Sequence, residues 1–399
     1  MASLIRLILR FFRTEAPPRH LPALTDDLLQ EIFVRIGSPV DLVRASTACV
    51  AFRRLIVDTS FLRRYRAIHP PLLIGFISDA GLLRAEPPHP SSPAAHAANF
   101  SFNDYLPPGR GPRWRPTDVR DGRVLLYCMP KLNDDVLFPD LAVCDPLSRQ
   151  YMLLPPIPDG QVREQLDFPD FLLVPSGPAE LETSFRVICC MRCMTRLVVF
   201  IYSSVSGYWT VTTSPTWPSL GFNVLPPDLL ELETKPQCVN GCFYWQVEKM
   251  NKLLKLEMTI MEFSIYDLPP DHDERIVSVV EGGEGKLALF SQKDGTSVEY
   301  YTLLQDGNGR ANEWHMENSI PLPFNYNSYI AGSGQGYIFL AGTWKEQDTK
   351  HTKYFSLEIK TFNIQRVCMG SRYWSGYPYF GFPPFMSASR IQGCEVVGF

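Results

Sequence analysis

The sequence has no stretch that would cross a membrane as a helix and no basic stripe that would follow a nucleic acid. Its apolar runs all stop short of the ~18 residues that a spanning helix needs. Residues 1–70 contain eleven arginines, no lysine and six acidic residues, so residues 71–399 carry a formal charge of −9 within a total of −4. We therefore expect no membrane span and no nucleic-acid partner.

Side chains suited to metal or covalent chemistry are few and poorly spaced. The seven histidines form no His-x-x-x-His pair and accompany no evident nucleophile, so we expect no catalytic metal, no serine-type site and no cofactor. Ten cysteines lie mostly inside apolar runs, as buried thiols do in a reducing compartment, which favours a cytoplasmic or nuclear location. Cys190 and Cys193 with Cys238 and Cys242 have zinc-like spacing, but the strand pattern around the first pair favours buried thiols.

Proline is abundant where glycine is not. The 399 residues contain 35 prolines and 26 glycines, yet 45% of the residues are hydrophobic and 49 are aromatic. Disorder requires low hydrophobicity and few aromatic residues, so most of the chain is expected to fold. The length favours two or three domains, unless one large all-β unit takes most of it.

Residues 25–65 carry the pattern of short helices. Thr25 is placed to cap a helix that is apolar at positions 28, 29, 32, 33 and 36, and Gly37 ends that helix. Ser38-Pro39 starts a second helix, a third runs through residues 49–56, and Asp58 or Thr59 caps a fourth. Such short helices are unstable singly, so we expect a bundle that needs a partner to cover its remaining apolar surface.

Three segments of this region, in this order, resemble an F-box. They are Leu21-Pro22-x-Leu24-x-Asp26-Asp27-Leu28-Leu29-x-Glu31-Ile32, Pro39-x-Asp41-Leu42-Val43-Arg44-Ala45-Ser46 and Cys49-x-x-Phe52-Arg53-x-Leu55-Ile56, and the match runs over residues 21–64. The following residues 69–76 are similar to the junction in large plant F-box families, whose C-terminal region is β-rich. F-boxes bind the Skp-type adaptor of cullin-RING ubiquitin ligases, so the resemblance implies that adaptor, and through it cullin, as partners.

Transferred position by position, the resemblance implies eight residues that contact the adaptor. They are Leu21, Pro22, Leu28, Ile32, Pro39, Leu42, Val43 and Phe52. The family usually has Trp at the position of Phe52; Phe keeps the aromatic ring but has less area and no indole N–H, so docking there is expected to be weaker. In an unrelated helical bundle the same residues would form only a core.

From residue 71 onward the pattern changes to short apolar or β-branched runs separated by turn residues. Glycine-led runs begin at Gly122, Gly241, Gly285 and Gly336, and Phe185 begins a similar run. Leu-Pro-Pro closes units at residues 106, 154, 225 and 268, and Leu-Pro closes another at 322, so the closings are 48, 71, 43 and 54 residues apart. Repeats of about 40 to 50 residues with four strands each are typical of a β-propeller.

The predicted fold is therefore a small all-α bundle followed by an all-β propeller of about six irregular blades. Residues 1–19 form an N-terminal extension, 20–69 the F-box and 70–399 the F-box-associated propeller. A ring of blades buries every apolar face, whereas a β-sandwich would not explain so long a repeat. The likeness to kelch repeats is weak because the doubled glycine occurs only at residues 282 and 283.

Four further segments carry weaker signals. Residues 85–98 are of low complexity and are expected to form a flexible loop, and residues 159–182 a long blade insertion. Glycines 332, 334 and 336 precede a strand, which favours a turn over a phosphate cradle. An aromatic cluster near the C-terminus packs the last blade or lines the mouth of the propeller; it comprises Tyr373, Trp374, Tyr377, Tyr379 and Phe380, of which the first three are weak candidates for substrate binding.

These features together predict the substrate-recognition subunit of an SCF-type ubiquitin ligase (Skp adaptor, cullin and F-box protein). The bundle would hold the adaptor and the propeller an unidentified target protein, so the chain itself would perform no bond chemistry. Two alternatives stay open: a regulator that binds the adaptor without ubiquitination, and a propeller enzyme that acts on a small ligand.

Overall fold

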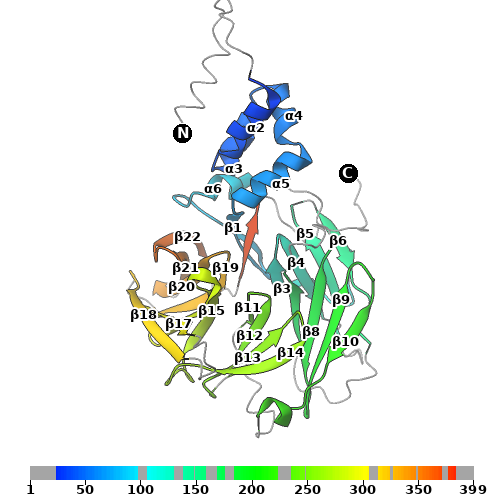
Figure 1. Cartoon of the computed structure of the whole chain (residues 1–399), viewed down its shortest axis with the longest axis vertical. Helices are drawn as coiled ribbons and strands as arrows, with labels where there is room; N and C mark the ends of the chain where they lie inside the picture. Colours follow the sequence, from blue (N-terminus) through cyan, green and yellow to red (C-terminus); the bar gives the residue numbers. More distant parts are fainter. Residues whose placement is uncertain are drawn as a thin grey trace, which may run out of the picture.

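A computed structural model of the chain describes residues 24–97, 106–129, 138–147, 149–158, 169–175, 184–222, 235–247, 249–304, 313–323, 327–346, 349–370 and 376–382. Short helices occupy the first part of this range, and nearly all the elements that follow are strands. Figure 1 shows the helices at one end of the long axis and the strands arranged around a common centre. The predicted architecture, short N-terminal helices followed by a six-bladed β-propeller, is confirmed.

Four capped helices form the bundle. They are α2 (Asp26–Val34), α3 (Pro39–Ser46), α4 (Val50–Ile56) and α5 (Thr59–Ile68). The side chain of Thr25 accepts a hydrogen bond from the Leu28 N–H at 3.3 Å, and the Asp58 carboxylate accepts from the Ser60 N–H at 2.9 Å, so both predicted caps are confirmed. These caps satisfy N–H groups that the first turn of a helix leaves without an intrahelical partner.

The core of the bundle is aromatic and aliphatic and is joined to the propeller. Phe33 and Phe52 meet edge to face with ring centroids 4.9 Å apart, and the Tyr65 hydroxyl donates to the Ile36 carbonyl at 2.7 Å. Phe382, which follows the last described strand, packs into the same cluster. The C-terminal end of the described chain therefore contacts the helices where they join the ring.

Five four-stranded antiparallel sheets are found among the described residues, each in chain order. They are β3 (Arg115–Arg120), β4 (Arg123–Cys128), β5 (Asp140–Asp145) and β6 (Gln150–Leu153); β7 (Asp170–Val174), β8 (Arg186–Arg192), β9 (Leu197–Ser203) and β10 (Trp209–Thr213); β11 (Gln237–Val239), β12 (Cys242–Val247), β13 (Lys252–Glu257) and β14 (Glu262–Asp267); β15 (Ile276–Glu281), β16 (Leu287–Gln292), β17 (Ser297–Leu304) and β18 (Glu313–Pro321); and β19 (Asn327–Gly334), β20 (Tyr337–Glu346), β21 (Thr349–Glu358) and β22 (Ile364–Gly370). The first strands of neighbouring blades touch, as β3 touches β7 and β11 touches β15, and so form the inner wall of the ring.

The sixth blade closes the ring with strands from both ends of the described chain. Its order is β2 (Gly81–Arg84), β1 (Leu72–Ser78) and β23 (Tyr377–Gly381). The β1–β23 register pairs Leu72 with Gly381 and shifts between Leu73 and Gly75. Gly75 has φ 155°, and a Cβ there would lie 2.1 Å from the Leu83 carbonyl oxygen, so only glycine allows β2 to approach this closely.

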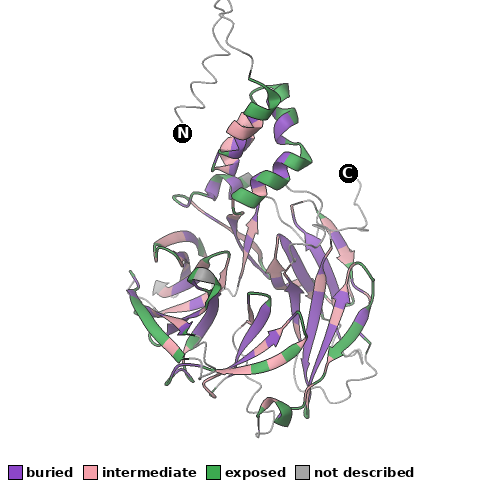
Figure 2. Ribbon diagram, viewed as in Figure 1, coloured by how far each residue is buried: buried purple, intermediate pink, exposed green. Residues whose placement is uncertain are grey.

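Apolar clusters between neighbouring blades hold the ring together. One cluster joins Val143 of β5 to Phe171 of β7, and another joins Phe290 of β16 to Leu340 of β20. Figure 2 shows buried strands toward the middle of the blades and exposed stretches along the outer strands β10, β14 and β18. This pattern is the one expected when stacked blades bury each other's faces.

The glycines that seemed to open each unit lie in hairpins between the first and second strands. Asp121-Gly122, Asn240-Gly241 and Gln335-Gly336 all have positive φ at both positions, as a two-residue type I′ turn requires. The glycine-led runs are therefore second strands, and the first strands precede them. The closings at residues 154, 268 and 322 follow the last strands of three blades, and residue 225 lies outside the described residues. The closing expected at residue 106 is wrong, because that residue lies between α6 (Ser92–Ala97) and β3 and follows no last strand of a blade.

Two sequence expectations about loops are wrong. The segment 159–182, expected to be an insertion, contains β7 (Asp170–Val174), the innermost strand of its blade, because its short apolar run Asp-Phe-Leu-Leu-Val is long enough for a buried strand. The segment 85–98 was expected to be flexible, but its described part packs on β1 through α6 (Ser92–Ala97). Ala85, Ala94 and Ala95 are buried there because small side chains allow close packing.

Candidate functional site

The structure divides the residues predicted to bind an adaptor into buried and accessible groups. Pro39, Leu42 and Phe52 are buried in the bundle, with Leu42 fully inaccessible. Ile32 and Val43 are half-buried, and Leu28 is 52% exposed. Leu21 and Pro22 lie outside the described residues. Of the described candidates, Leu28 therefore offers most surface to a partner, whereas the buried three act by supporting the helices.

Several apolar residues that sequence reasoning did not select are exposed on the same bundle. Val50, the first residue of α4, is 86% exposed, and Leu24, Val57 and Ile68 are also exposed. Scattered single apolar residues are normal on a protein surface, but here they gather on a unit of four short helices. The exposure of Val50 could have been inferred from its place in the sequence. Val50 is the first residue of α4, directly after the cap Cys49, so no preceding helical turn covers its side chain.

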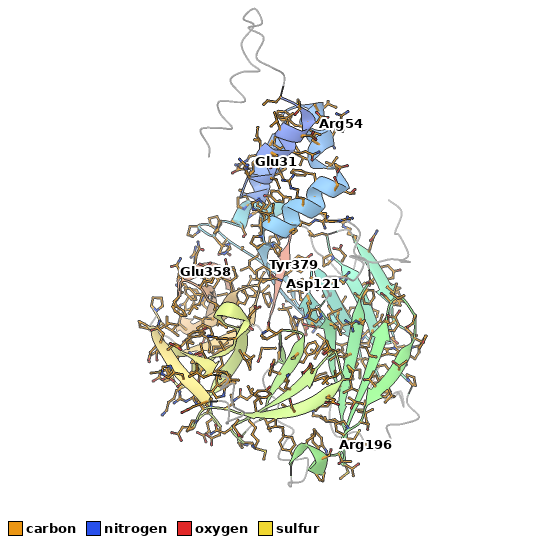
Figure 3. The ribbon with its side chains drawn as sticks, viewed as in Figure 1. Glu31, Arg54, Asp121, Arg196, Glu358 and Tyr379 are labelled. Carbon is orange, nitrogen blue, oxygen red and sulfur yellow. The ribbon has the colours of Figure 1, made fainter. Side chains whose placement is uncertain are left out.

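Ion pairs on the bundle surface connect helices that are distant in sequence. Arg54 of α4 pairs with Asp26 of α2 at 2.9 Å, and Arg64 of α5 pairs with Glu31 of α2. Figure 3 shows Glu31 and Arg54 on the helices, far from Arg196 at the opposite end of the molecule. Because these pairs are exposed, each contributes only ~0–1 kcal/mol and mainly fixes the orientation of the arginines.

The propeller encloses a central cavity of about 1440 Å³. Its wall comes from first strands and the turns that follow them, and includes residues 117–122, 170–172, 235–241, 279–283, 331–336 and 376–378. The turn residues Asn240, Gly241, Gln335 and Gly336 are exposed, so the cavity reaches solvent at the end where first strands turn into second strands. Glycines 332, 334 and 336 belong to β19 and its turn into β20, as the turn interpretation predicted.

Charged and aromatic side chains from three blades meet in this wall. Asp118 and Arg120 lie on β3, Lys235 precedes β11, and Tyr377 begins β23. The Asp118 carboxylate accepts hydrogen bonds from the Val119 N–H and from a backbone N–H of β7, both at 2.8 Å. The Arg120 Nε lies 3.8 Å from an Asp118 oxygen, and the Lys235 Nζ lies 3.2 Å from the centroid of the Tyr377 ring.

Burial shifts the protonation of these groups. Burial raises the pKa of Asp118 against the opposing effect of Arg120 and of two backbone N–H groups. Burial lowers the pKa of Lys235 to about 8, and the nearby Asp118 only partly opposes this shift. Burial also raises the pKa of Cys238 to about 11, so its thiol stays protonated and unreactive at neutral pH.

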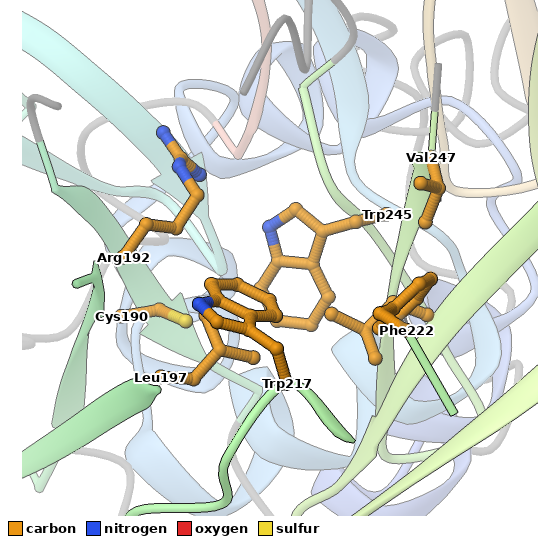
Figure 4. Close-up of a pocket in the computed structure, with 8 residues that line it drawn as sticks. Cys190, Arg192, Leu197, Trp217, Phe222, Trp245 and Val247 are labelled. Carbon is orange, nitrogen blue, oxygen red and sulfur yellow. The ribbon is translucent and has the colours of Figure 1, made fainter. Parts of the chain in front are cut away.

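A second, much smaller cavity lies between the blades that begin with β7 and β11. It measures about 20 Å³, room for about one water, and Figure 4 shows the indoles of Trp217 and Trp245 among the side chains that line it. The Trp245 Nε1–H donates to Asp170 at 3.1 Å, and Arg192 donates to the same oxygen at 2.8 Å. This is a packing site that positions Asp170, because it is too small for a ligand.

The aromatic residues near the C-terminus divide between core and cavity. Tyr373 and Trp374 lie outside the described residues. Tyr377 and Phe380 line the central cavity, whereas Tyr379 is fully buried and its hydroxyl donates to the Gly122 carbonyl at 3.3 Å (Figure 3). Of the three weak candidates for substrate binding, Tyr377 is therefore the one that the structure places in a cavity.

No metal centre is found within the part of the chain that the structure describes. No three His, Cys, Asp or Glu side chains gather there to hold an ion. The two cysteine pairs with zinc-like spacing lie in different blades, and Cys190, Cys193 and Cys242 are buried and form no disulfide. Within the same described ranges, no helix combines the length and the apolar character needed to cross a membrane.

The fold defines the class of this protein: a six-bladed β-propeller with N-terminal helices. No protein-family model matches the chain, and no curated protein matches it. Similar solved structures include a luciferin-regenerating enzyme (10% identity, 66% of this chain and 76% of that chain, TM-score 0.31) and a fungal lectin from Aleuria aurantia described as a six-bladed β-propeller (13%, 67% and 77%, 0.31). TolB from Acinetobacter baumannii is another (9%, 65% and 56%, 0.32). Likeness at this level carries no argument about function.

Proposed function

We propose that this chain is an F-box protein that serves as the substrate-recognition subunit of an SCF-type ubiquitin ligase. The observation that carries the proposal is the order of the three F-box-like segments over residues 21–64, together with four short capped helices in the region they span. Exposed Leu28 and Val50 supply apolar surface for a Skp-type adaptor. Residues 24–69 also carry seven arginines against five acidic residues, which suits an acidic partner surface.

The arrangement of helices and blades suits a protein that holds its target close to an enzyme bound at the helices. The bundle stands at the rim of the sixth blade, and Phe382 and β1 connect it directly to the ring (Figure 1). A target held by the propeller would thereby be kept near a ubiquitin-conjugating enzyme, which raises the effective concentration of the target's lysines. The buried free thiols fit the reducing conditions of the cytoplasm or nucleus, where we propose that the protein acts.

Co-purification of the full chain with a Skp-type adaptor tests this proposal. Leu28→Asp places a charge on exposed apolar surface, so we expect it to abolish co-purification without unfolding the chain. Val205→Asp is the matched control, since Val205 is also exposed but lies on the propeller, between β9 and β10. Failure of the wild-type chain to retain the adaptor, under conditions that retain known F-box bundles, would contradict the proposal.

The lifetime of the captured proteins distinguishes a substrate receptor from a regulator that only binds the adaptor. Proteins captured by a chain lacking residues 20–69 should include targets whose lifetime lengthens in cells that carry Leu28→Asp. If the captured proteins keep the same lifetime and are not ubiquitinated, the regulator is the correct interpretation. The experiment uses the accessible Leu28 because loss of a buried residue would also unfold the bundle.

A propeller that acts on a small ligand is a second candidate, favoured by one feature of the cavity. The cavity is large enough for a ligand, and Lys235 in its wall has its pKa lowered to about 8 by burial, which suits a nucleophilic amine. The two oxygens of nearby Asp118 accept hydrogen bonds from backbone N–H groups, so this carboxylate has a structural role rather than a catalytic one. This candidate predicts ligand turnover by the isolated chain, whereas the receptor predicts none.

A further inference from the structure

The central cavity is closed at one end. Lys235 precedes β11 and Tyr377 begins β23, and these strands belong to blades on opposite sides of the ring, with β15 and β19 between them on one side and β3 and β7 on the other. The Lys235 Nζ nevertheless lies 3.2 Å from the centroid of the Tyr377 ring, so the two side chains meet across the width of the ring. Solvent does not reach this nitrogen. The pair therefore forms a floor at the end where first strands begin.

The open end of the cavity is the end with the turns. Among the described residues of the wall, every exposed one lies at the end of a first or third strand or in the turn that follows, at positions 240, 241, 281, 283, 285, 335, 336 and 360. First and third strands of an antiparallel blade run in the same direction, so these ends lie on one side of the ring. The described wall residues near the starts of first strands are buried or half-buried, as Asp170, Pro236 and Gly376 are. The cavity is therefore blind and has a single mouth.

The mouth of the cavity lies beside the bundle. Phe382 directly follows β23, Pro71 directly precedes β1, and both residues line the cavity. Phe382 also packs into the core of the helices, and Figure 1 shows β23 pointing from the ring toward α5. The floor lies at the other end of β23, because Tyr377 is the first residue of that strand. A molecule that enters the cavity must therefore approach from the side that carries the helices.

We infer that the cavity receives a projecting peptide segment of a partner protein, a loop or a chain end, inserted from the side of the helices. The volume of about 1440 Å³ exceeds the ~300–1,000 Å³ of pockets that hold drug-sized molecules, so it suits a peptide segment. The floor excludes a chain that threads through the ring. Ser333 and Gln335 at the mouth have side chains that both donate and accept hydrogen bonds, as peptide groups require.

The single mouth fixes which side of the propeller holds a target. In the receptor role, the inserted segment belongs to the protein to be ubiquitinated, and this part of the inference rests on the proposed function. The target would then lie on the same side of the ring as the adaptor-binding helices, within reach of an enzyme bound there. Insertion itself is measured on the chain alone, without an adaptor. Failure of one proposal can therefore be told from failure of the other.

Selection of random linear peptides, displayed on phage, against the immobilised full chain tests the insertion. Ser333→Cys places a thiol in the wall of the cavity; N-ethylmaleimide should alkylate this thiol in the free chain, and a selected peptide should slow the reaction, as followed by mass spectrometry. Gly334→Trp should abolish peptide binding by filling the cavity, and it should still fold, because a Cβ there meets only Phe380, at 3.8 Å. Val205→Trp is the matched control, since Val205 is exposed and lies outside the cavity wall.

Three results would overturn the inference: no peptide is selected, the selected peptides bind Gly334→Trp as tightly as the wild type, or they leave the alkylation rate of Ser333→Cys unchanged. A thiol that does not react in the free chain would also overturn it, since the cavity would then be closed, or filled by the chain itself or a second copy. If Gly334→Trp does not fold, Gly283→Trp replaces it, because Gly283 is exposed at the mouth and a Cβ there meets nothing within 4 Å. Unchanged binding to that variant would equally contradict insertion through this mouth.

Discussion

Truncation of Leu42 and of Leu28 to alanine should separate support of the bundle from contact with a partner. Both residues come from the same predicted set of eight, but Leu42 is completely buried whereas Leu28 is 52% exposed. Leu42→Ala removes buried methyl groups from a core that includes Leu29, Phe33 and Ile56, so it should cost ~2–5 kcal/mol. Leu28→Ala should change the free energy of unfolding by no more than ~0.5 kcal/mol.

Hydrogen exchange measured by mass spectrometry resolves this difference by segment. Each ~1.4 kcal/mol corresponds to a tenfold change in an equilibrium constant, so Leu42→Ala should speed exchange in α2–α5 by ~30-fold or more. Exchange in the blades should stay unchanged in both variants, except near Phe382, which packs on the bundle. If Leu28→Ala destabilises the helices as much as Leu42→Ala, the division of the predicted residues into surface and core is wrong.

Three further substitutions test the propeller. His272 is buried, and burial lowers its pKa, so below pH ~6.5 the unfolded chain takes up a proton that the folded chain does not. The free energy of unfolding should therefore decrease as the pH falls below ~6.5. His272→Gln should reduce this pH dependence, as measured by urea unfolding. Gly241→Ala forces a side chain into φ 72° and should cost ~1–2 kcal/mol, against a few tenths for Gly283→Ala, which meets neither strain nor contact; equal losses would contradict the turn assignment. Trp245→Phe deprives Asp170 of one donor and should lower stability by ~1–3 kcal/mol in the same assay, so an unchanged midpoint would show that this hydrogen bond is dispensable.

The sequence predicted the ends of helices and blades where a single residue type determines them. Thr25 and Asp58 mark helix starts because their side chains accept the first free N–H groups, and the structure confirms both. Proline after leucine marks the ends of blades because a missing N–H is harmless where pairing stops, as at residues 154, 268 and 322. These signals depend on neighbours in sequence, which is why they could be predicted.

The composition of the central cavity could not be predicted in the same way. Arg120 and Lys235 belong to different blades, and Tyr377 comes from the strand that closes the ring, so only the tertiary structure brings them together. The strand β7 (Asp170–Val174) was missed because prolines flank its five residues and suggested a loop. The burial of Leu42 and Phe52, against the exposure of Leu28, likewise depends on how four helices pack rather than on the spacing of their apolar residues.

The most direct test of the proposed function is the footprint of a purified Skp-type adaptor on the full chain. We predict a complex of one adaptor per chain in which hydrogen exchange slows in α2 and α4, around Leu28 and Val50, while the wall of the central cavity exchanges as in the free chain. Absence of a complex, or protection confined to the blades, would contradict the assignment of the helices as an adaptor-binding F-box.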